Sequence, residues 1–443
     1  MRPHRNVQLR RAVASSYLGS VIEYYDFLLY ATASAVVFNK VFFANLDPAL
    51  ATVASFGTFA TGYLARPLGG ILFGHFGDKL GRKRMLVMTM TLMGVSSFLI
   101  GLLPTYGQIG AVAPVGLVLL RVLQGISVGG EWGGAVLMSA EHATSRRGLW
   151  ASFTNAGAPS GMVLSTVAMT ATVAITGEAA FLEWGWRVPF LLSVVLLAIG
   201  LFVRARVEET PAFLAANTTA PRRRFPLVAV LRDQPKTLLL GVGVGLAAFV
   251  VQATLTTFVL AYGVQAGHGR QAVLNALTIS SAFAVVGIIG WSALSDRFGR
   301  RPIVLIGAVV TAVYGFFLFP LVDSGSGALL VLALVIGQGV LHPMMYGPLA
   351  ALYTELFATE NRYTGASLGY QLAGLGAGFA PVLFAEFQRG SGGSSTMAVS
   401  WTIAAFCLLS AGCVLALKET NRRDLIETRP ARPVAAEAAE AVE

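Results

Sequence analysis

Long apolar runs alternate with short polar segments along the whole chain. A helix that crosses a membrane needs about 20 consecutive, predominantly apolar residues. Twelve runs meet this requirement, at residues 15–39, 50–76, 84–104, 112–139, 149–176, 188–206, 237–265, 271–294, 303–322, 327–353, 364–388 and 396–417. The pattern therefore predicts an all-α integral membrane protein with twelve transmembrane helices.

The positions of the basic residues give this topology an orientation. Of the 32 Lys and Arg residues, 26 fall on one side of twelve alternating spans and four on the other, while Arg66 and Arg121 lie within spans. Because Lys and Arg accumulate on the cytoplasmic side of membrane proteins, both termini are expected in the cytoplasm. The same bias explains the net charge of +10 without a nucleic-acid partner.

Composition and motifs narrow the class of protein further. Charged residues make up 12% of the chain, against about 25% in soluble proteins, and the mean hydropathy is +0.68. The sequence has no phosphate-binding loop, no nucleophile elbow and no metal-ligand spacing. We therefore expect neither an enzyme nor an ATP-driven pump, and no cofactor or metal. The energy for transport would come from an ion gradient or from the gradient of the substrate itself.

Landmarks of the first half recur in the second half. The basic hairpin Gly74–Arg84 (GHFGDKLGRKR) returns as Ser292–Arg301, with its aspartate 218 residues later (78 to 296). Two further sets of polar residues recur in the same order and at nearly the same offset. Glu141 and Arg147 follow span four, as Glu355 and Arg362 follow span ten. Glu209 follows span six, as Glu419 follows span twelve.

This recurrence predicts a duplicated chain, which suits alternating access to a site between the halves. The expected units are a cytoplasmic N-terminus (1–14), an N-terminal six-helix half (15–206), a linker (207–236), a C-terminal half (237–417) and a cytoplasmic tail (418–443). The end of the tail is low in complexity and expected to be disordered.

The hairpin Gly74–Arg84 resembles the loop between the second and third helices of the major facilitator superfamily. Other stretches are similar to its metabolite:proton symporter branch, which imports compounds such as shikimate, α-ketoglutarate, citrate, proline and betaine. These stretches are Glu23–Phe27, Arg66–Gly70, Arg121–Glu131, Gly185–Phe190, Glu209–Phe213 and Arg362–Ser367. The resemblance implies the twelve-helix fold of that superfamily and proton-coupled transport.

The resemblance also implies that the hairpin is a latch between the halves. Asp78 would bond a helix end near Thr364, and Arg82 would reach a carboxylate such as Glu141. The gating residues expected from the two copies are Gly74, Asp78, Gly81, Arg82, Asp296 and Arg300. Because Ser292 stands where the first copy has Gly74, the first latch is expected to dominate.

Charged residues inside the spans are the candidates for proton coupling, because they are costly to bury in a membrane. At about 1.5 Å per residue, Asp26 and Arg121 both lie near the middle of the membrane and can meet. Asp26 is the first candidate for the coupling proton. The alternative is a permanently ionised structural pair.

Glu131 and Arg66 both lie in the inner third of the membrane. They are expected either to pair and close the inner gate, or to separate so that Arg66 binds a substrate carboxylate bidentately. Glu23 lies one turn from Asp26. Glu131 and Glu23 are the second candidates for the coupling proton, and the alternative for Glu23 is a partnership with Arg66.

The candidate substrate ligands combine the buried cations with polar side chains in mid-span. Arg121 and Arg66 would supply positive charge for a carboxylate. The neutral candidates are Tyr30, Gln252, Gln338, Tyr346 and Gln371, each of which can instead simply bond a neighbouring helix. Tryptophans near the span ends are expected to be interfacial anchors, with Trp132 alternatively flooring a pocket; they are Trp132, Trp184, Trp186, Trp291 and Trp401.

The sequence thus predicts a secondary transporter of a bacterial inner membrane that works as a monomer within the lipid bilayer. It would import a small carboxylate-bearing metabolite, an organic acid or a zwitterion, by proton symport. The alternative is a proton-independent facilitator or an exporter of small organic solutes.

Overall fold

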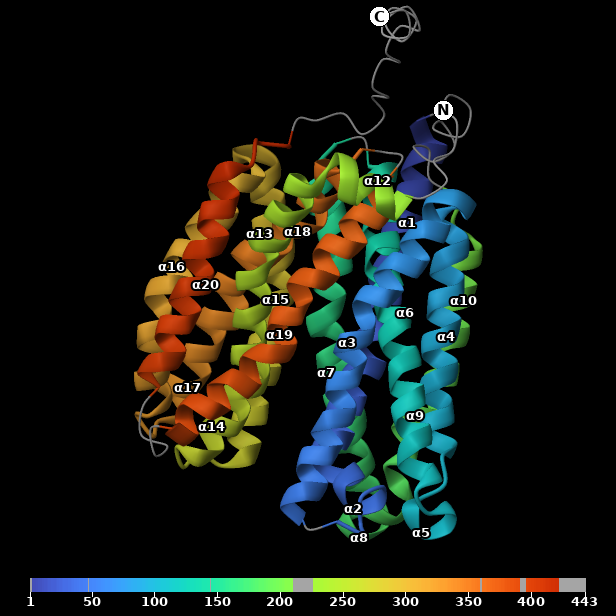
Figure 1. The fold of residues 1–443 in the computed structure, drawn as a ribbon, viewed down its shortest axis with the longest axis vertical. Coiled ribbons are helices and arrows are strands. Elements are labelled where there is room, and N and C mark those ends of the chain that lie inside the picture. The colour runs from blue at the N-terminus through green and yellow to red at the C-terminus, as the bar shows by residue number, and fades with distance from the viewer. Residues whose placement is uncertain are drawn as a thin grey trace, which may run out of the picture.

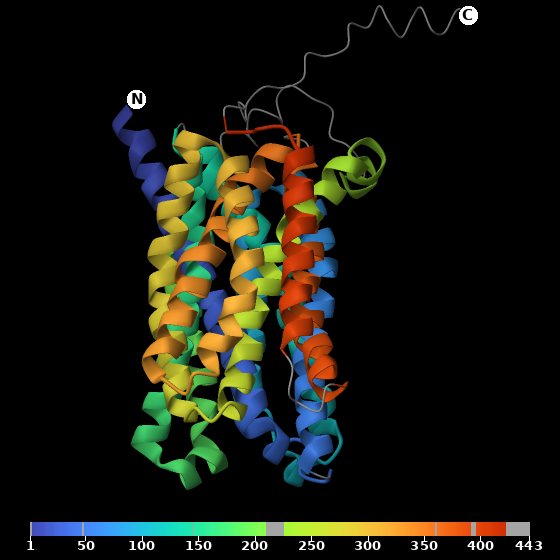
Figure 2. The same cartoon turned by 90° about the vertical axis from the view of Figure 1, so that its left-hand side faces the viewer.

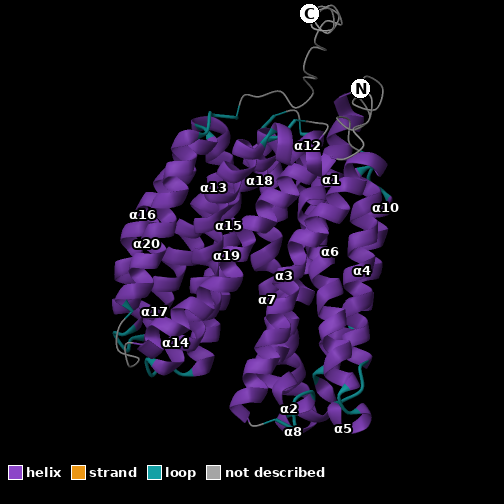
Figure 3. Ribbon diagram, viewed as in Figure 1, coloured by secondary structure: helices purple, strands orange, loops and turns teal. Residues whose placement is uncertain are grey.

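The computed structural model describes residues 2–46, 48–143, 145–209, 226–358, 361–390 and 396–421. Within these ranges the chain is helical and contains no strand (Figure 3). The predicted twelve-helix architecture is confirmed, and each predicted span matches one helical segment, extending past its ends by at most two residues. Most of the predicted linker and the end of the predicted tail lie outside the described residues.

The N-terminal half contains six long helical segments. They are α1 (Arg2–Ala33) continued by η1 (Ser34–Phe38) and α2 (Asn39–Val41), then α3 (Pro48–Leu80), α4 (Arg82–Leu102), α6 (Val112–His142), α7 (Arg147–Thr176), and α9 (Arg187–Leu191) with α10 (Ser193–Ala205). Short turns of helix occupy the loops, at α5 (Tyr106–Ile109), α8 (Glu178–Ala180) and η2 (Phe181–Gly185). Because α1 begins at Arg2, the predicted N-terminal segment is a continuation of the first spanning helix.

The C-terminal half repeats this plan. Its segments are α13 (Pro235–Ala253) with η3 (Thr254–Phe258) and α14 (Val259–Gln265), α15 (Arg270–Phe298), α16 (Arg300–Val322), α17 (Gly327–Leu334) with η4 (Val335–Leu341) and α18 (His342–Leu356), α19 (Arg362–Gly390), and α20 (Met397–Ala416). One helix of the linker, α12 (Pro226–Asp233), was not predicted.

The two halves stand side by side (Figure 1). The start of α1 and the end of α20 lie at the same end of the bundle, as an even number of spans requires. We call this end the basic end, because it carries the hairpins of residues 74–84 and 292–301. The ribbons of the halves meet near the basic end and diverge toward the opposite end, and the long helices run nearly parallel in the orthogonal view (Figures 1 and 2).

Glycines let α3 and α6 approach each other closely. A Cβ atom added to Gly125 would fall on the carbonyl oxygen of Gly62, and one added to Gly129 would fall on that of Arg66. Small residues at such positions allow membrane helices to pack backbone against backbone. This packing holds Arg66 and Arg121, one on each helix, inside the N-terminal half.

Burial separates the tryptophans into two groups. Nine of the described helices are long and apolar enough to cross a membrane. Trp184 and Trp401 are 49% and 64% exposed, as residues that anchor a protein at the membrane surface should be. Trp132 and Trp186 are 2% and 0% exposed, so the prediction that they are interfacial anchors was wrong. Trp186 packs against Phe38, Phe42 and Phe190 in the core of the N-terminal half.

Candidate functional site

At the basic end, Asp78 joins the N-terminal half to the C-terminal half. Its carboxylate accepts hydrogen bonds from the backbone N–H groups of Tyr363 and Thr364 at 3.2 and 3.1 Å, and from the Thr364 hydroxyl at 2.8 Å. These donors form the first turn of α19, where the helix dipole favours a negative charge. The contact expected near Thr364 is confirmed, and we call it the first latch.

Asp296 makes the equivalent contact in the opposite direction. It lies on α15 in the C-terminal half and accepts from the backbone N–H groups of Gly148 and Leu149, at the start of α7, at 2.8 and 2.9 Å. Arg300 lies 2.8 Å from the same carboxylate. We call this contact the second latch.

Each latch is backed by a glutamate between two arginines. Glu141 lies 3.7 Å from Arg82 and 3.1 Å from Arg362, so the predicted reach of Arg82 to Glu141 is confirmed. In the other copy Glu355 lies 3.1 Å from Arg300 and 3.5 Å from Arg147. In both copies one arginine belongs to each half, and the networks therefore span the interface.

Two further glutamates cap the helices that follow the hairpins. Glu209 accepts from the backbone N–H groups of Arg82 and Lys83 at the start of α4, and Glu419 does the same for Arg300 and Arg301 at the start of α16. Partial burial raises the pKa of Glu419, but backbone N–H donors outweigh it and hold that pKa below its usual range. Gly81 and Gly299 make the turns before these helices with φ of 105° and 104°, a backbone conformation that favours glycine.

Asp26 and Arg121 do not form the ion pair expected from their common depth. Asp26 is fully buried, accepts a hydrogen bond from the Ser193 hydroxyl of α10, and has Ser97 of α4 beside it. Arg121 donates to Gln124 at 3.0 Å, and Gln124 donates to Ser97 at 2.7 Å. The two groups are thus connected only through Gln124 and Ser97.

Arg121 and Arg66 share an aromatic neighbour instead of a carboxylate. Their guanidinium carbons lie 3.9 and 4.2 Å from the centre of the Phe27 ring. Arg121 also lies over Tyr30, and Arg66 over Tyr63. Aromatic faces attract cations, but they do not neutralise them.

Glu131 pairs with Arg204 of α10, and the predicted pair with Arg66 was wrong. The Arg204 guanidinium donates to both carboxylate oxygens, and Thr89 donates to Oε2 at 2.6 Å. Arg204 is 2% exposed. The sequence analysis did not count it among the cations within spans, although it lies within predicted span six (188–206).

Comparisons with known proteins identify the family of this chain. The sequence model of the family described as Major Facilitator Superfamily matches residues 17–381 and, in a second match, residues 276–438. The chain belongs to the major facilitator superfamily. It is therefore a membrane transporter rather than an enzyme.

Relatives in this superfamily cover nearly the whole chain. The shikimate transporter of Escherichia coli K12 is 37% identical over 93% of this chain and 95% of its own length. The inner membrane metabolite transport protein YhjE of the same organism is 37% identical over 94% and 95%. The proline/betaine transporter of E. coli K12 is 35% identical over 96% of this chain and 86% of its own length.

Solved structures show the same fold. The proton:xylose symporter XylE bound to 6-bromo-6-deoxy-D-glucose superimposes with a TM-score of 0.75 at 19% identity, covering 96% of this chain and 98% of XylE.

Between the halves of this superfamily transporter lies a cluster of aromatic side chains. The Tyr370 hydroxyl is 2.6 Å from that of Tyr346 and 3.4 Å from that of Tyr24, which lies across the interface on α1. Trp132 stacks on Tyr370 at 3.5 Å and donates to Asn155. Of this cluster, only Tyr346 was a predicted site residue. Trp132, for which the sequence left a pocket floor as the alternative, also belongs to this cluster.

The other predicted substrate ligands occupy different surroundings. Tyr30 donates to Thr58 beneath Arg121, and Gln371 donates to the carbonyl oxygen of Gly129 across the interface at 3.2 Å. Gln338 exchanges hydrogen bonds with Ser280 and Ser281 of α15, which is the structural role of bonding a neighbouring helix. Gln252 is partly exposed on α13.

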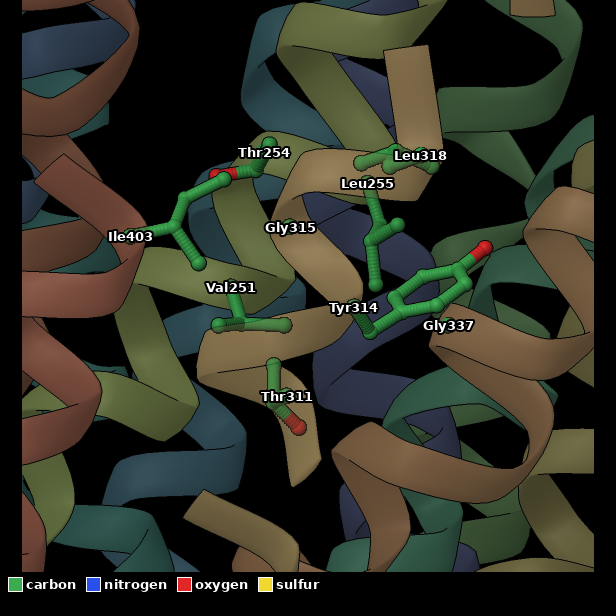
Figure 4. Close-up of a pocket in the computed structure, with 9 residues that line it drawn as sticks. All are labelled: Val251, Thr254, Leu255, Thr311, Tyr314, Gly315, Leu318, Gly337 and Ile403. Carbon is green, nitrogen blue, oxygen red and sulfur yellow. The ribbon is translucent and has the colours of Figure 1, made fainter. Parts of the chain in front are cut away.

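A cavity within the C-terminal half has none of these groups in its lining (Figure 4). Mainly apolar side chains from α13, η3, α16, η4 and α20 line it, including Leu255, Leu318 and Ile403. The Thr311 hydroxyl has no hydrogen-bond partner among the described residues. The cavity faces neither the other half nor a charged group, so we do not assign it to the transport site.

Proposed function

We propose that this transporter imports a small carboxylate-bearing metabolite together with protons, and that a single chain is the transport unit. The observation that carries the proposal is the state of Arg66 and Arg121. They are 3% and 0% exposed, and neither has an anionic partner among the described residues. An unpaired buried charge costs several kcal/mol, so a site with two such cations favours an anionic ligand.

The names of the relatives agree with this ligand class. Shikimate, proline and betaine each carry a carboxylate, and a guanidinium can bind a carboxylate by donating two parallel hydrogen bonds to it. The aromatic side chains around the two arginines add apolar surface for the remainder of such a molecule. By the distribution of basic residues, the basic end is cytoplasmic. The latched structure is then the state closed toward the cytoplasm of an inner membrane protein.

The connection from Arg121 to Asp26 supports Asp26 as a coupling group. A substrate carboxylate that engages Arg121 would compete with Gln124 for the guanidinium. A displaced Gln124 would release Ser97, which lies beside the Asp26 carboxyl. Substrate binding and proton binding would thus act on one chain of hydrogen bonds, as coupling between two sites requires.

Ligand binding to purified protein tests the carboxylate site. A ligand that binds the folded state raises its apparent thermal stability, so shikimate, citrate, L-proline and glycine betaine are compared in a thermal-shift titration. Loss of one partner from a charge-paired site costs about 2–5 kcal/mol, and Arg121→Gln should therefore weaken binding by at least about 30-fold. Arg206→Gln, which changes an exposed arginine at the end of α10, is the matched control. Unchanged binding by Arg121→Gln would contradict the site.

Transport in proteoliposomes tests proton coupling. Asp26→Asn should abolish accumulation driven by an imposed proton gradient while counterflow exchange of substrate continues. Full pH-dependent accumulation by that variant would remove Asp26 from the mechanism. Uptake by the unmodified protein that ignores the proton gradient would instead favour a facilitator.

A further inference from the structure

We propose that Glu23, beside the Glu131–Arg204 pair, is a second proton-binding site, separate from Asp26. The proposal rests on proton-coupled transport as the proposed function, and it assigns the carrier role to Glu23 and a positioning role to Arg204. Proton binding here adds a hydrogen to one carboxylate oxygen of Glu23 and changes no other bond.

The Glu131–Arg204 pair is complete without Glu23. Glu131 receives two hydrogen bonds from Arg204 and one from Thr89, and Arg204 also donates to the Leu86 carbonyl. The charges of the pair cancel, and both carboxylate oxygens of Glu131 are occupied. Glu131 is therefore poorly placed to take a proton, because protonation would break a buried ion pair.

Glu23 is buried without any such partner. Its side chain is 4% exposed, and Oε1 has no hydrogen-bond partner among the described residues. A buried carboxylate that is neither paired nor hydrogen-bonded is far less stable than the neutral acid. The surroundings of Glu23 therefore accommodate its protonated form in this conformation.

A small cavity brings the two carboxyl groups together. Glu23 and Glu131 both line it. The polar side chain of Ser127 and the apolar side chains of Met90 and Met93 also belong to its lining. The charged groups that act on Glu23 come from three other helices: Glu131 of α6, Arg204 of α10 and Arg66 of α3. Arg204 is already matched by Glu131, and neither Arg204 nor Arg66 forms an ion pair with Glu23 among the described residues. Ionisation of Glu23 would therefore place a second negative charge beside Glu131 without a cation in contact with it.

The local sequence of α1 is fitted to this arrangement. Gly19 lies one turn before Glu23, and a Cβ atom there would fall on the Arg204 guanidinium and lie 3.0 Å from Glu131 Oε1. Glycine thus leaves the space into which Arg204 extends. On α10, Ser193 contacts Asp26 and Arg204 lies about three turns further along. Helix α10 therefore contacts a carboxyl group of α1 through Ser193 and one of α6 through Arg204.

Infrared difference spectroscopy of the purified protein tests the site without any substrate. Steps of pH report the carbonyl stretch of each carboxyl group that takes up or releases a proton. We expect a band that Glu23→Gln removes, that Asp26→Asn leaves in place, and that Arg204→Lys shifts in frequency. A spectrum of Glu23→Gln that keeps every band would overturn the proposal, as would a band that responds to sodium chloride rather than to pH.

A second variant keeps the test decisive if Glu23→Gln does not fold. Glu23→Asp retains a carboxyl group on a shorter side chain, so it should move the band rather than remove it, and an unmoved band would count against Glu23. Because the spectra need no substrate, they separate this proposal from the proposed function. A proton band at Glu23 with no proton-driven accumulation by the unmodified protein would refute symport and leave the site intact.

Discussion

The two latches are copies of one device built with different residues. Asp78 receives three hydrogen bonds from α19 and its side chain is 2% exposed. Asp296 receives two from α7 and is 12% exposed. Buried, charge-assisted hydrogen bonds are stronger than exposed ones. The first latch should therefore contribute more to the closed basic end than the second.

The position of glycine also differs between the latches. In the first latch Gly74 lies on the helix that carries the aspartate, and a Cβ there would lie 2.9 Å from the Thr364 Cα. In the second latch Ser292 takes that place, and Gly148 of the opposing helix provides the close approach instead. Ser292 therefore does not make the second latch defective, because Gly148 on the opposing helix allows the close approach that Gly74 allows in the first latch.

Asp78→Asn should have the largest effect of the latch substitutions. It removes the charge and one of the two acceptor oxygens, and a hydrogen bond to a charged group contributes about 1.5–3 kcal/mol. The equilibrium should shift toward the state open at the basic end by about 10- to 150-fold. Hydrogen exchange reports it directly, because the amides of Tyr363 and Thr364 lose their acceptor.

The same variant separates gating from ligand binding. Asp78 lies at the basic end, apart from the arginines near Phe27, so substrate affinity measured by thermal shift should stay near that of the unmodified protein. Unchanged exchange at Tyr363 and Thr364, or a large loss of affinity, would contradict the assignment of Asp78 to a latch.

Gly148→Ala should come next, through packing rather than charge. The added Cβ would fall on the Arg300 guanidinium and lie 2.6 Å from the Ser292 carbonyl oxygen, and overpacking of this kind costs about 1–3 kcal/mol. Faster exchange at Leu149 is the expected result. Ser292→Ala is the control, since the buried Ser292 hydroxyl has no hydrogen-bond partner among the described residues, and removing such a hydroxyl should not destabilise the latch. If Ser292→Ala opened the latch as much as Gly148→Ala, the claim that Gly148 allows the close helix approach in the second latch would be wrong.

Asp296→Asn should open the second latch less than Asp78→Asn opens the first. The substitution weakens two backbone hydrogen bonds and removes one of the two carboxylates that pair with Arg300. The closed state should lose about 1–2 kcal/mol of stability. Arg300 keeps Glu355 as a partner. The measurement is exchange at the Gly148 and Leu149 amides, compared with Tyr363 and Thr364 in Asp78→Asn. An effect larger than that of Asp78→Asn would reverse the ranking of the latches.

The sequence was informative where contacts follow from repetition or length. The lengths of the apolar runs and the positions of the basic residues suffice to predict twelve helices with both chain ends on one side. The repeated hairpin predicts the positions of both latches. The contacts of Asp78 and Arg82 agree with what the family resemblance implied. These features depend on position along the chain, which a sequence displays directly.

Partners inside the bundle could not be predicted in the same way. Depth along a helix axis says nothing about direction around it, and successive residues point about 100° apart. Asp26 faces α10, while Phe27 and Tyr30 face Arg121. Arg204 was missed for a related reason: near a span end, charge alone does not distinguish a buried ion pair from a solvated loop. The interior of the N-terminal half thus required three-dimensional information.

The caps Glu209 and Glu419 offer the smallest test of the comparison between the copies. Glu419→Gln should destabilise the start of α16 by about 0.3–1 kcal/mol, the usual contribution of an anion at an exposed helix N-terminus. The pKa of Glu419 is lowered in the folded protein, so its contribution is present above the pKa of the unfolded chain and is lost as pH falls through the lower folded value. Thermal unfolding of Glu419→Gln and of the unmodified protein should therefore differ at neutral pH and converge in acid. A difference that persists in acid would show that the side chain acts through packing rather than through its charge.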